Sequence, residues 1–194
     1  VLQAELGKDI EVKDFSFPYL EHLVPTYYVL STAEASSNLS RFDGVHYGHR
    51  SAESKGVDET YKNSRSEGFG KEVKRRIMTG TFVLSHGYYD AYYTKAQKVR
   101  RLAKIATDEI FKNVDVLITP TTASTAFKIG SVSDPLQMYL QDIFTVHANI
   151  TGHPAISVPF GTHSNGMPFG LQIMSPCNEE AKLLYYAELL KNYF

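Results

Sequence analysis

Apolar side chains recur at steps of three and four over residues 89–110, the clearest helical period in this 194-residue chain. The stripe consists of Tyr89, Tyr92, Ala96, Val99, Leu102, Ala106 and Ile110. Residues 71–84 predict a preceding helix, which "TGTFVLSHG" ends as a glycine-marked break. The rings of Tyr89 and of Tyr92 or Tyr93 are expected in the core, with their polar tips toward water.

Proline and glycine positions predict two helices nearer the start of the chain. Pro25 suits the first residue of a helix that continues to about Leu39. The segment 41–70 is polar and punctuated by glycine, so we expect a long loop with a short helix near 58–64. Loops of this length in compact domains are usually functional or mobile.

Two more helices are predicted in the second half of the chain. Asp134 followed by Pro135 is typical of an N-cap and the first helical residue, and this helix should end near Gly152. Its expected apolar side comprises Leu136, Tyr139, Leu140, Ile143 and His147. Asn178 is the expected cap of the last helix, whose apolar face comprises Ala181, Leu184, Tyr185 and Leu189.

Strand patterns occupy the remaining segments. Residues 10–17 alternate and are rich in β-formers, and 114–120 is a continuous apolar run typical of a strand buried on both faces. Residues 155–161 and 169–175 flank an Asn-Gly step, which predicts a hairpin. Strands separated by helices indicate an α/β fold with a mixed β-sheet flanked by helices, organised as a single domain over 1–194.

Composition restricts the classes of function. The 20 Lys and Arg residues nearly balance the 21 Asp and Glu residues, so no overall basic field attracts a polyanion. Cys177 is the single cysteine, which excludes an internal disulfide and favours a reducing, cytoplasmic setting. No apolar run approaches the roughly 18 residues that a membrane span needs. The first residue is Val1, and Gly7 suits a helix C-cap, so we expect a chain cut inside a larger protein.

Hydrolytic and metal chemistry find little support in the motifs. The seven histidines fall on different predicted elements, and no pair has the helical spacing with a glutamate that zinc hydrolases use. We therefore expect no metal. A GxSxG nucleophile turn is also absent from the chain.

Two basic clusters, "KEVKRR" and "KAQKVRR", fit either a phosphate-binding surface or two solvated helix faces. Arg75 and Arg76 are adjacent, so they lie about 100° apart on a helix and one of them can face inward. An inward guanidinium needs an internal acid or a carboxylate-bearing ligand. Asp142, in the middle of a predicted helix, is either a solvated surface residue or the partner of an ammonium, which would make the ligand an α-amino acid.

Longer strings resemble a known family. "AEASSNLSRFDGVHYGHR", "RSEGFGKEVKRRIMTGTFVLSHGYYDAYYTKAQKVRR", "VDVLITPTT", "DPLQMYLQDIFTVHANITGHPAISVPFG" and "MPFGLQIM" resemble the C-terminal portion of the A subunits of bacterial aspartyl/glutamyl-tRNA amidotransferases, a branch of the amidase signature family. The resemblance extends from about residue 10 to the end of the chain, in the same order and at similar spacing.

The resemblance implies a glutamine amidohydrolase whose ammonia converts Glu-tRNA(Gln) or Asp-tRNA(Asn) to the amidated form. It also implies partner subunits B and C in a heterotrimer, with ATP and Mg used by the partner subunit, while none is used in this chain. The family's Ser-cis-Ser-Lys triad lies in a glycine- and serine-rich signature upstream of this sequence. The resemblance therefore implies that these residues supply no catalytic group and are inactive alone.

The resemblance also assigns binding residues. Arg76, the second arginine of "KRR", corresponds to the residue that grips the substrate α-carboxylate, and Asp142 corresponds to the one that holds the α-ammonium. Tyr27 and Tyr28 fall where the family lines the same pocket, and which ring points inward stays open. Two alternatives remain, namely an amidase signature hydrolase that acts on another amide and a module that contacts tRNA directly.

Overall fold

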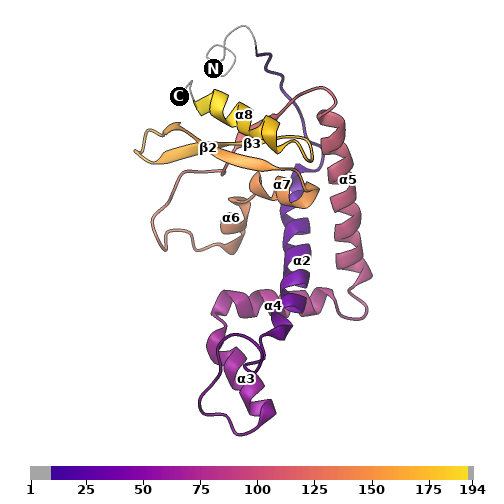
Figure 1. Cartoon of the computed structure of the whole chain (residues 1–194), viewed down its shortest axis with the longest axis vertical. Helices are drawn as coiled ribbons and strands as arrows, with labels where there is room; N and C mark the ends of the chain where they lie inside the picture. Colours follow the sequence, from indigo (N-terminus) through magenta and orange to yellow (C-terminus); the bar gives the residue numbers. More distant parts are fainter. Residues whose placement is uncertain (1–9, 192–194) are drawn as a thin grey trace. The chain divides into compact units, whose positions relative to one another are not determined.

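The computed structural model describes residues 10–191, which belong to two compact units. One unit comprises Val1–Val24 and Val99–Phe194, and the other comprises Pro25–Lys98. Figure 1 labels the helices and strands in chain order. The helix end expected at Gly7 lies outside the described residues. None of the helices in the described range is both long and apolar enough to cross a membrane.

The Pro25–Lys98 unit contains α3 (Val57–Gly68), α4 (Lys71–Val83), a short 3₁₀ turn at Leu39–Arg41 and all of α2 (Leu20–Asn38) from Pro25 onward. The end of α2 and the extent of α4 confirm the predictions, and α3 extends past the expected 58–64. Helix α2 begins five residues before Pro25, so the predicted start is wrong. Leu23 and Val24 are buried before the proline, and their packing favours helix although Pro25 lacks an N–H.

Helix α4 contacts α2 through a glycine. A Cβ added to Gly80 would overlap the carbonyl oxygen of Thr32 and would lie 2.6 Å from the Cβ of Ser36. One turn along α2, the Ser36 hydroxyl lies 3.0 Å from the Thr81 hydroxyl. Gly80 therefore allows close helix packing inside α4, and the break predicted within "TGTFVLSHG" is confirmed beyond Val83. The break comes at Gly87, whose φ of 87° favours glycine.

The helical period at 89–110 forms a π-helical segment, Asp90–Thr94, followed by α5 (Lys95–Ile110). The expected core position is wrong for Tyr89 and Tyr92, which are 45% and 43% exposed, whereas Tyr93, the alternative to Tyr92, is half-buried. The π turn holds more residues per turn than an α-helix, so it rotates the rings away from the face that Ala96 continues. Leu102 is also exposed, and the buried face of α5 comprises Ala96, Ala103 and Thr107.

The sheet of the other unit has three strands, β1 (Leu117–Pro120), β2 (Ala155–Thr162) and β3 (Pro168–Met174), in the order β1-β3-β2. The predicted hairpin is confirmed as β2 and β3. The two described ladders are both antiparallel, so the parallel pairs of a mixed sheet are not found among them. Residues 10–17 form no strand. Their alternation changes phase between 12 and 15, so apolar side chains leave one face of an extended segment for the other.

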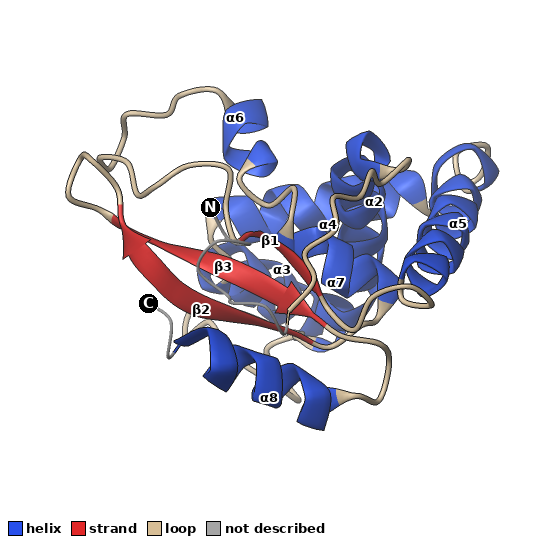
Figure 2. Ribbon diagram, turned by 90° about the horizontal axis from the view of Figure 1, so that it is seen from above, coloured by secondary structure: helices blue, strands red, loops and turns tan. Residues whose placement is uncertain are grey.

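Each face of this sheet packs against a helix (Figure 2). Alternate residues of β3 face opposite sides, as a pleated strand requires. Leu171 and Ile173 join a cluster with helix α8 (Glu180–Lys191), whereas Met174 joins Leu117 and Ala148 on the other side. The apolar face predicted for α8 is wrong: Leu184 and Tyr185 are exposed, and the buried residues are Leu183, Ala187 and Leu190. The apolar residues of α8 lie on all sides of the helix, so the sequence pattern alone does not show which side packs against the sheet.

The predicted 135–150 helix is divided into α6 (Pro135–Leu140) and α7 (Thr145–Thr151). The Asp134 cap is confirmed, because its side chain accepts from the Leu136 amide. Asp142 lies in the turn between the helices, and its carbonyl accepts from the Val146 amide at 3.0 Å. Aspartate is common in turns, so Asp142 at this position does not require a ligand to explain it. Helix α7 ends as expected at Gly152, in the left-handed region.

Replacing Gly80 by alanine should destabilise the Pro25–Lys98 unit. The added methyl group has no room beside the Thr32 carbonyl, and overpacking of this kind costs about 1–3 kcal/mol. Urea unfolding followed by circular dichroism measures the loss. Gly70→Ala is the matched control, because a Cβ at Gly70 would meet nothing within 4 Å. Equal midpoints for the two variants would contradict a tight contact at Gly80.

Candidate functional site

Two arginines on α4 share one carboxylate. Glu72 accepts from Arg75 Nη1 at 2.8 Å and from Arg76 Nε at 3.2 Å. Arg76 is the more covered of the pair, with 36% of its side chain exposed compared with 51% for Arg75. The acid that pairs with the more covered arginine is therefore Glu72, whose own side chain is 49% exposed. Because two guanidinium groups face one carboxylate, this group of three side chains retains a net positive charge.

The guanidinium of Arg76 lies over the ring of Tyr28, 5.5 Å from the ring centroid. Tyr28 and Tyr27 are half-buried on α2, and their rings meet edge to face with centroids 5.3 Å apart. Arg76, Tyr27 and Tyr28 are thus brought together inside one unit, and the ring that faces the arginine is that of Tyr28. Stacking on a ring fixes the plane of a guanidinium, which orients its donor nitrogens.

The surroundings of Arg76 favour its charged form. Burial by itself lowers the pKa of Arg76, but the hydrogen bond and charge of Glu72 outweigh burial and raise it. Glu72 accepts its hydrogen bond from Nε of Arg76. In the described part of the same unit, neither terminal nitrogen of Arg76 has a hydrogen bond, so both are available to a carboxylate in bidentate geometry.

Asp142, the other member of the predicted pair, belongs to the unit that contains the sheet. Its side chain is half-buried in the turn that joins α6 to α7. The Thr145 hydroxyl donates to the Asp142 carbonyl at 3.1 Å, which with the Val146 amide begins α7. The backbone of Asp142 is therefore fixed by the helix that follows it.

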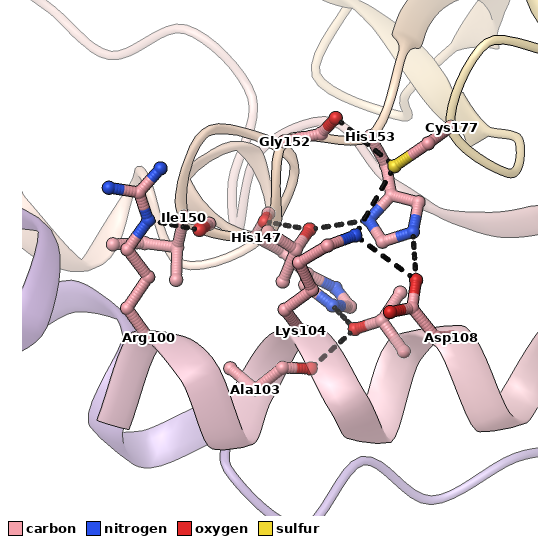
Figure 3. Close-up of polar contacts among 11 residues, drawn as sticks. Arg100, Ala103, Lys104, Asp108, His147, Ile150, Gly152, His153 and Cys177 are labelled. Carbon is pink, nitrogen blue, oxygen red and sulfur yellow. Dashed lines mark hydrogen bonds and ion pairs between the residues drawn. The ribbon is translucent and has the colours of Figure 1, made fainter. Parts of the chain in front are cut away.

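A second polar cluster gathers side chains from distant parts of the chain (Figure 3). Lys104 on α5 donates to Asp108 Oδ1 at 3.2 Å and to Cys177 Sγ at 3.3 Å. His153 Nε2 lies 3.1 Å from the same carboxylate oxygen, and its side chain is fully buried. Ligand atoms of Asp108, His153 and Cys177 all lie within 4.8 Å of one another. Among the described residues, these three could hold a metal ion.

Opposing effects set the charge states in this cluster. Burial lowers the pKa of His153, and the charge of Lys104 lowers it further, although Asp108 opposes both. Burial also acts to lower the pKa of Lys104, but its contacts with Cys177 and Asp108 outweigh burial and raise it. Neutral imidazole beside a charged ammonium is the arrangement that these effects favour.

A buried histidine on α7 lies beside this cluster. His147 Nε2 lies 2.8 Å from the hydroxyl of Thr107, which itself donates to the Ala103 carbonyl at 2.9 Å. The imidazole therefore donates to Thr107. The ring also packs on Phe17, with centroids 4.3 Å apart. Burial lowers the pKa of His147 to about 4, with a smaller contribution from His153.

Sequence reasoning missed Glu72 and the Lys104 cluster for different reasons. Glu72 stands three and four residues before the two arginines, and that helical spacing was a usable signal. By contrast, His153 and Cys177 are 45 and 69 positions beyond Asp108, so no local spacing indicates their proximity. Only the folded chain brings them together.

Comparison with known proteins places these features in a family. A family model described as Amidase matches residues 3–184. The A subunit of the glutamyl-tRNA(Gln) amidotransferase of Halothermothrix orenii is 57% identical over 180 residues, which are 93% of this chain and 38% of that protein. The corresponding protein of Koribacter versatilis is 54% identical over 183 residues, 94% of this chain and 38% of that protein. This chain thus spans well under half the length of these relatives.

Solved structures agree with the fold. The crystal structure of the glutamyl-tRNA(Gln) amidotransferase A subunit from Thermotoga maritima is 43% identical, with a TM-score of 0.64 over 91% of this chain and 33% of that chain. An amidase at 22% identity has a TM-score of 0.69 over 94% of this chain and 37% of that chain, which shows a shared fold. The fold class expected from the resemblance is confirmed.

Acid should destabilise the protein through His147. The pKa of about 4 lies below the ordinary value of 6.5, so the fold favours the neutral ring. Its stabilisation is complete above pH 6.5 and is lost as the pH falls toward 4, by roughly 3 kcal/mol. Urea unfolding at pH 7 and pH 4 should show a smaller pH effect for His147→Gln than for the unchanged chain. His163→Gln, at an exposed hairpin position, is the control. An equal pH effect in the His147 variant would exclude this role.

Proposed function

This chain belongs to the amidase family, and we propose that it forms the amino-acid-binding side of the glutamine pocket in the A subunit of a tRNA-dependent amidotransferase. The observation that carries the proposal is the fixed guanidinium of Arg76, held by Glu72 and stacked on Tyr28. Similarity to two A subunits at 54% and 57% identity supports glutamine, which has a matching α-carboxylate, as the proposed substrate.

Each proposed binding residue has a chemical role. Arg76 binds the α-carboxylate through its two terminal nitrogens, because Glu72 engages Nε and neutralises only one of two neighbouring guanidinium groups. Tyr28 supports the plane of that guanidinium, and Tyr27 packs against the Tyr28 ring. Asp142 binds the α-ammonium. Holding both ends of the amino acid orients its side-chain amide toward a nucleophile.

In the proposed full-length protein, hydrolysis of that amide releases ammonia, and the nucleophile lies outside these residues. The ammonia is used on Glu-tRNA(Gln) or Asp-tRNA(Asn) with ATP and Mg in a partner subunit. Subunits B and C complete a cytoplasmic heterotrimer. Similarity to the A subunits of glutamyl-tRNA(Gln) amidotransferases supports this assignment.

Neither alternative is favoured by a specific observation. Relatives at 22% identity or below share the fold, which does not select another amide. For tRNA contact, the basic clusters would need available cations, yet several are engaged locally. Arg75 contacts Glu72, Lys74 donates to the Ser66 carbonyl, and Arg100 donates to the Ile150 carbonyl. These contacts hold the three side chains against the protein's own groups, so each would have to give up a contact to reach a phosphate group.

Arg76→Ala in the full-length protein, assembled with its partners, should raise the KM for glutamine. Loss of the charge-assisted pair costs about 2–4 kcal/mol, which corresponds to about a 30- to 700-fold increase in KM. Steady-state glutaminase assays measure it. Arg75→Ala is the matched control, because Arg75 contacts the same Glu72 and is more exposed. An unchanged KM in Arg76→Ala, or a larger effect in Arg75→Ala, would refute the assignment.

A further inference from the structure

The cluster around His153 joins three separate segments of one unit (Figure 3). Asp108 lies on α5, His153 follows α7, and Cys177 follows β3. Their carboxylate, imidazole and thiol groups are the oxygen, nitrogen and sulfur ligands that zinc uses in proteins. We propose that Asp108, His153 Nε2 and Cys177 Sγ bind a divalent cation of the zinc class.

Hydrogen bonding determines which nitrogen of His153 is available. The Thr151 hydroxyl donates to the His147 carbonyl at 2.8 Å, so its oxygen can only accept from His153 Nδ1, 2.9 Å away. Nδ1 therefore carries the hydrogen, and the neutral ring presents the lone pair of Nε2 to the cluster. Histidine ligands of metals commonly have a hydrogen bond of this kind on the second nitrogen.

A cation between His153 Nε2 and Asp108 Oδ1 would stabilise the contact between them. The lone pair of Nε2 faces Asp108 Oδ1 at 3.1 Å, and two acceptors at this distance repel each other. A proton on Nε2 or a metal ion between the two atoms would remove the conflict. A metal ion resolves it by accepting electron pairs from both atoms.

Lys104 supplies the positive charge in the described structure. Its Nζ contacts both Asp108 and Cys177, so the ammonium competes directly with a metal for these ligands. The Lys104 side chain is 43% exposed, which allows it to rotate toward water. On binding, the metal forms a bond to sulfur and the thiol proton passes to solvent, so two negative ligands balance a doubly charged ion.

The required movement is small. Tetrahedral zinc with bonds of about 2.0–2.3 Å places its ligand atoms about 3.5 Å apart, compared with separations up to 4.8 Å here. The buried His153 can stay in place while the other two ligands approach it. The Asp108 side chain is 46% exposed, and Cys177 lies in a turn. A bound ion would then connect α5 to the turn that precedes α8.

Cobalt(II) provides a direct test, since it replaces zinc and reports sulfur ligation by absorption. Titration of the 194-residue chain should give a 1:1 complex with a sulfur-to-cobalt charge-transfer band that zinc abolishes. Cys177→Ser should lose this band, and His153→Gln should lose binding. Lys104→Met should bind cobalt more tightly, because the competing ammonium is gone. Thr151→Val should weaken binding about 10- to 100-fold by freeing the His153 ring.

His163→Gln, which changes an exposed histidine of the same unit, should bind as the unchanged chain does. Circular dichroism of each variant separates loss of a ligand from loss of the fold, and Lys104→Met changes no ligand at all. Absence of the charge-transfer band at millimolar cobalt in both the unchanged chain and Lys104→Met would overturn the proposal. A band that persists in Cys177→Ser would overturn it equally.

Discussion

The close approach of α4 to α2 at Gly80 is the constraint on which the Pro25–Lys98 unit depends. A side chain at Gly80 would collide with the Thr32 carbonyl, so glycine sets how closely the two helices pack. One helical turn before each of these residues, Arg76 meets the ring of Tyr28. The contact that gives the unit its packing therefore also places the guanidinium on its aromatic support.

Both polar sites in this chain hold a cation that acids neutralise in part. At α4, one carboxylate, Glu72, serves two arginines, and the surplus positive charge suits a ligand carboxylate. At α5, Lys104 serves Asp108 and the Cys177 sulfur, and a metal ion could take its place. At α4 the ligand chemistry follows from the positive charge that Glu72 leaves unbalanced, and at α5 it follows from the oxygen, nitrogen and sulfur atoms that lie close together.

Local signals predicted the elements well, and packed faces poorly. The hairpin was predicted from Asn165-Gly166, and the helix cap was predicted from Asp134. Both signals are encoded within a few residues. The packed face of α8 was missed because apolar residues of that helix lie on all its sides. The turn at Asp142 was missed because the helical period of apolar residues continues across it. At the candidate site, Arg76 and Tyr28 lie on different helices and are 48 positions apart in the sequence, so no local pattern encodes their contact. The family resemblance, confirmed by the Amidase match, supplied the residues that periodicity could not.

The proposed function depends on recognition of the glutamine α-carboxylate by Arg76. It is tested most directly by comparing glutamine with 4-aminobutanamide, the same amide without that carboxylate, as substrates of the full-length enzyme. Arg76→Ala should lower kcat/KM for glutamine by about 30- to 700-fold and leave kcat/KM for 4-aminobutanamide unchanged, because the analogue has no group for the arginine to bind. An equal loss for both substrates would show that Arg76 acts on something other than the carboxylate.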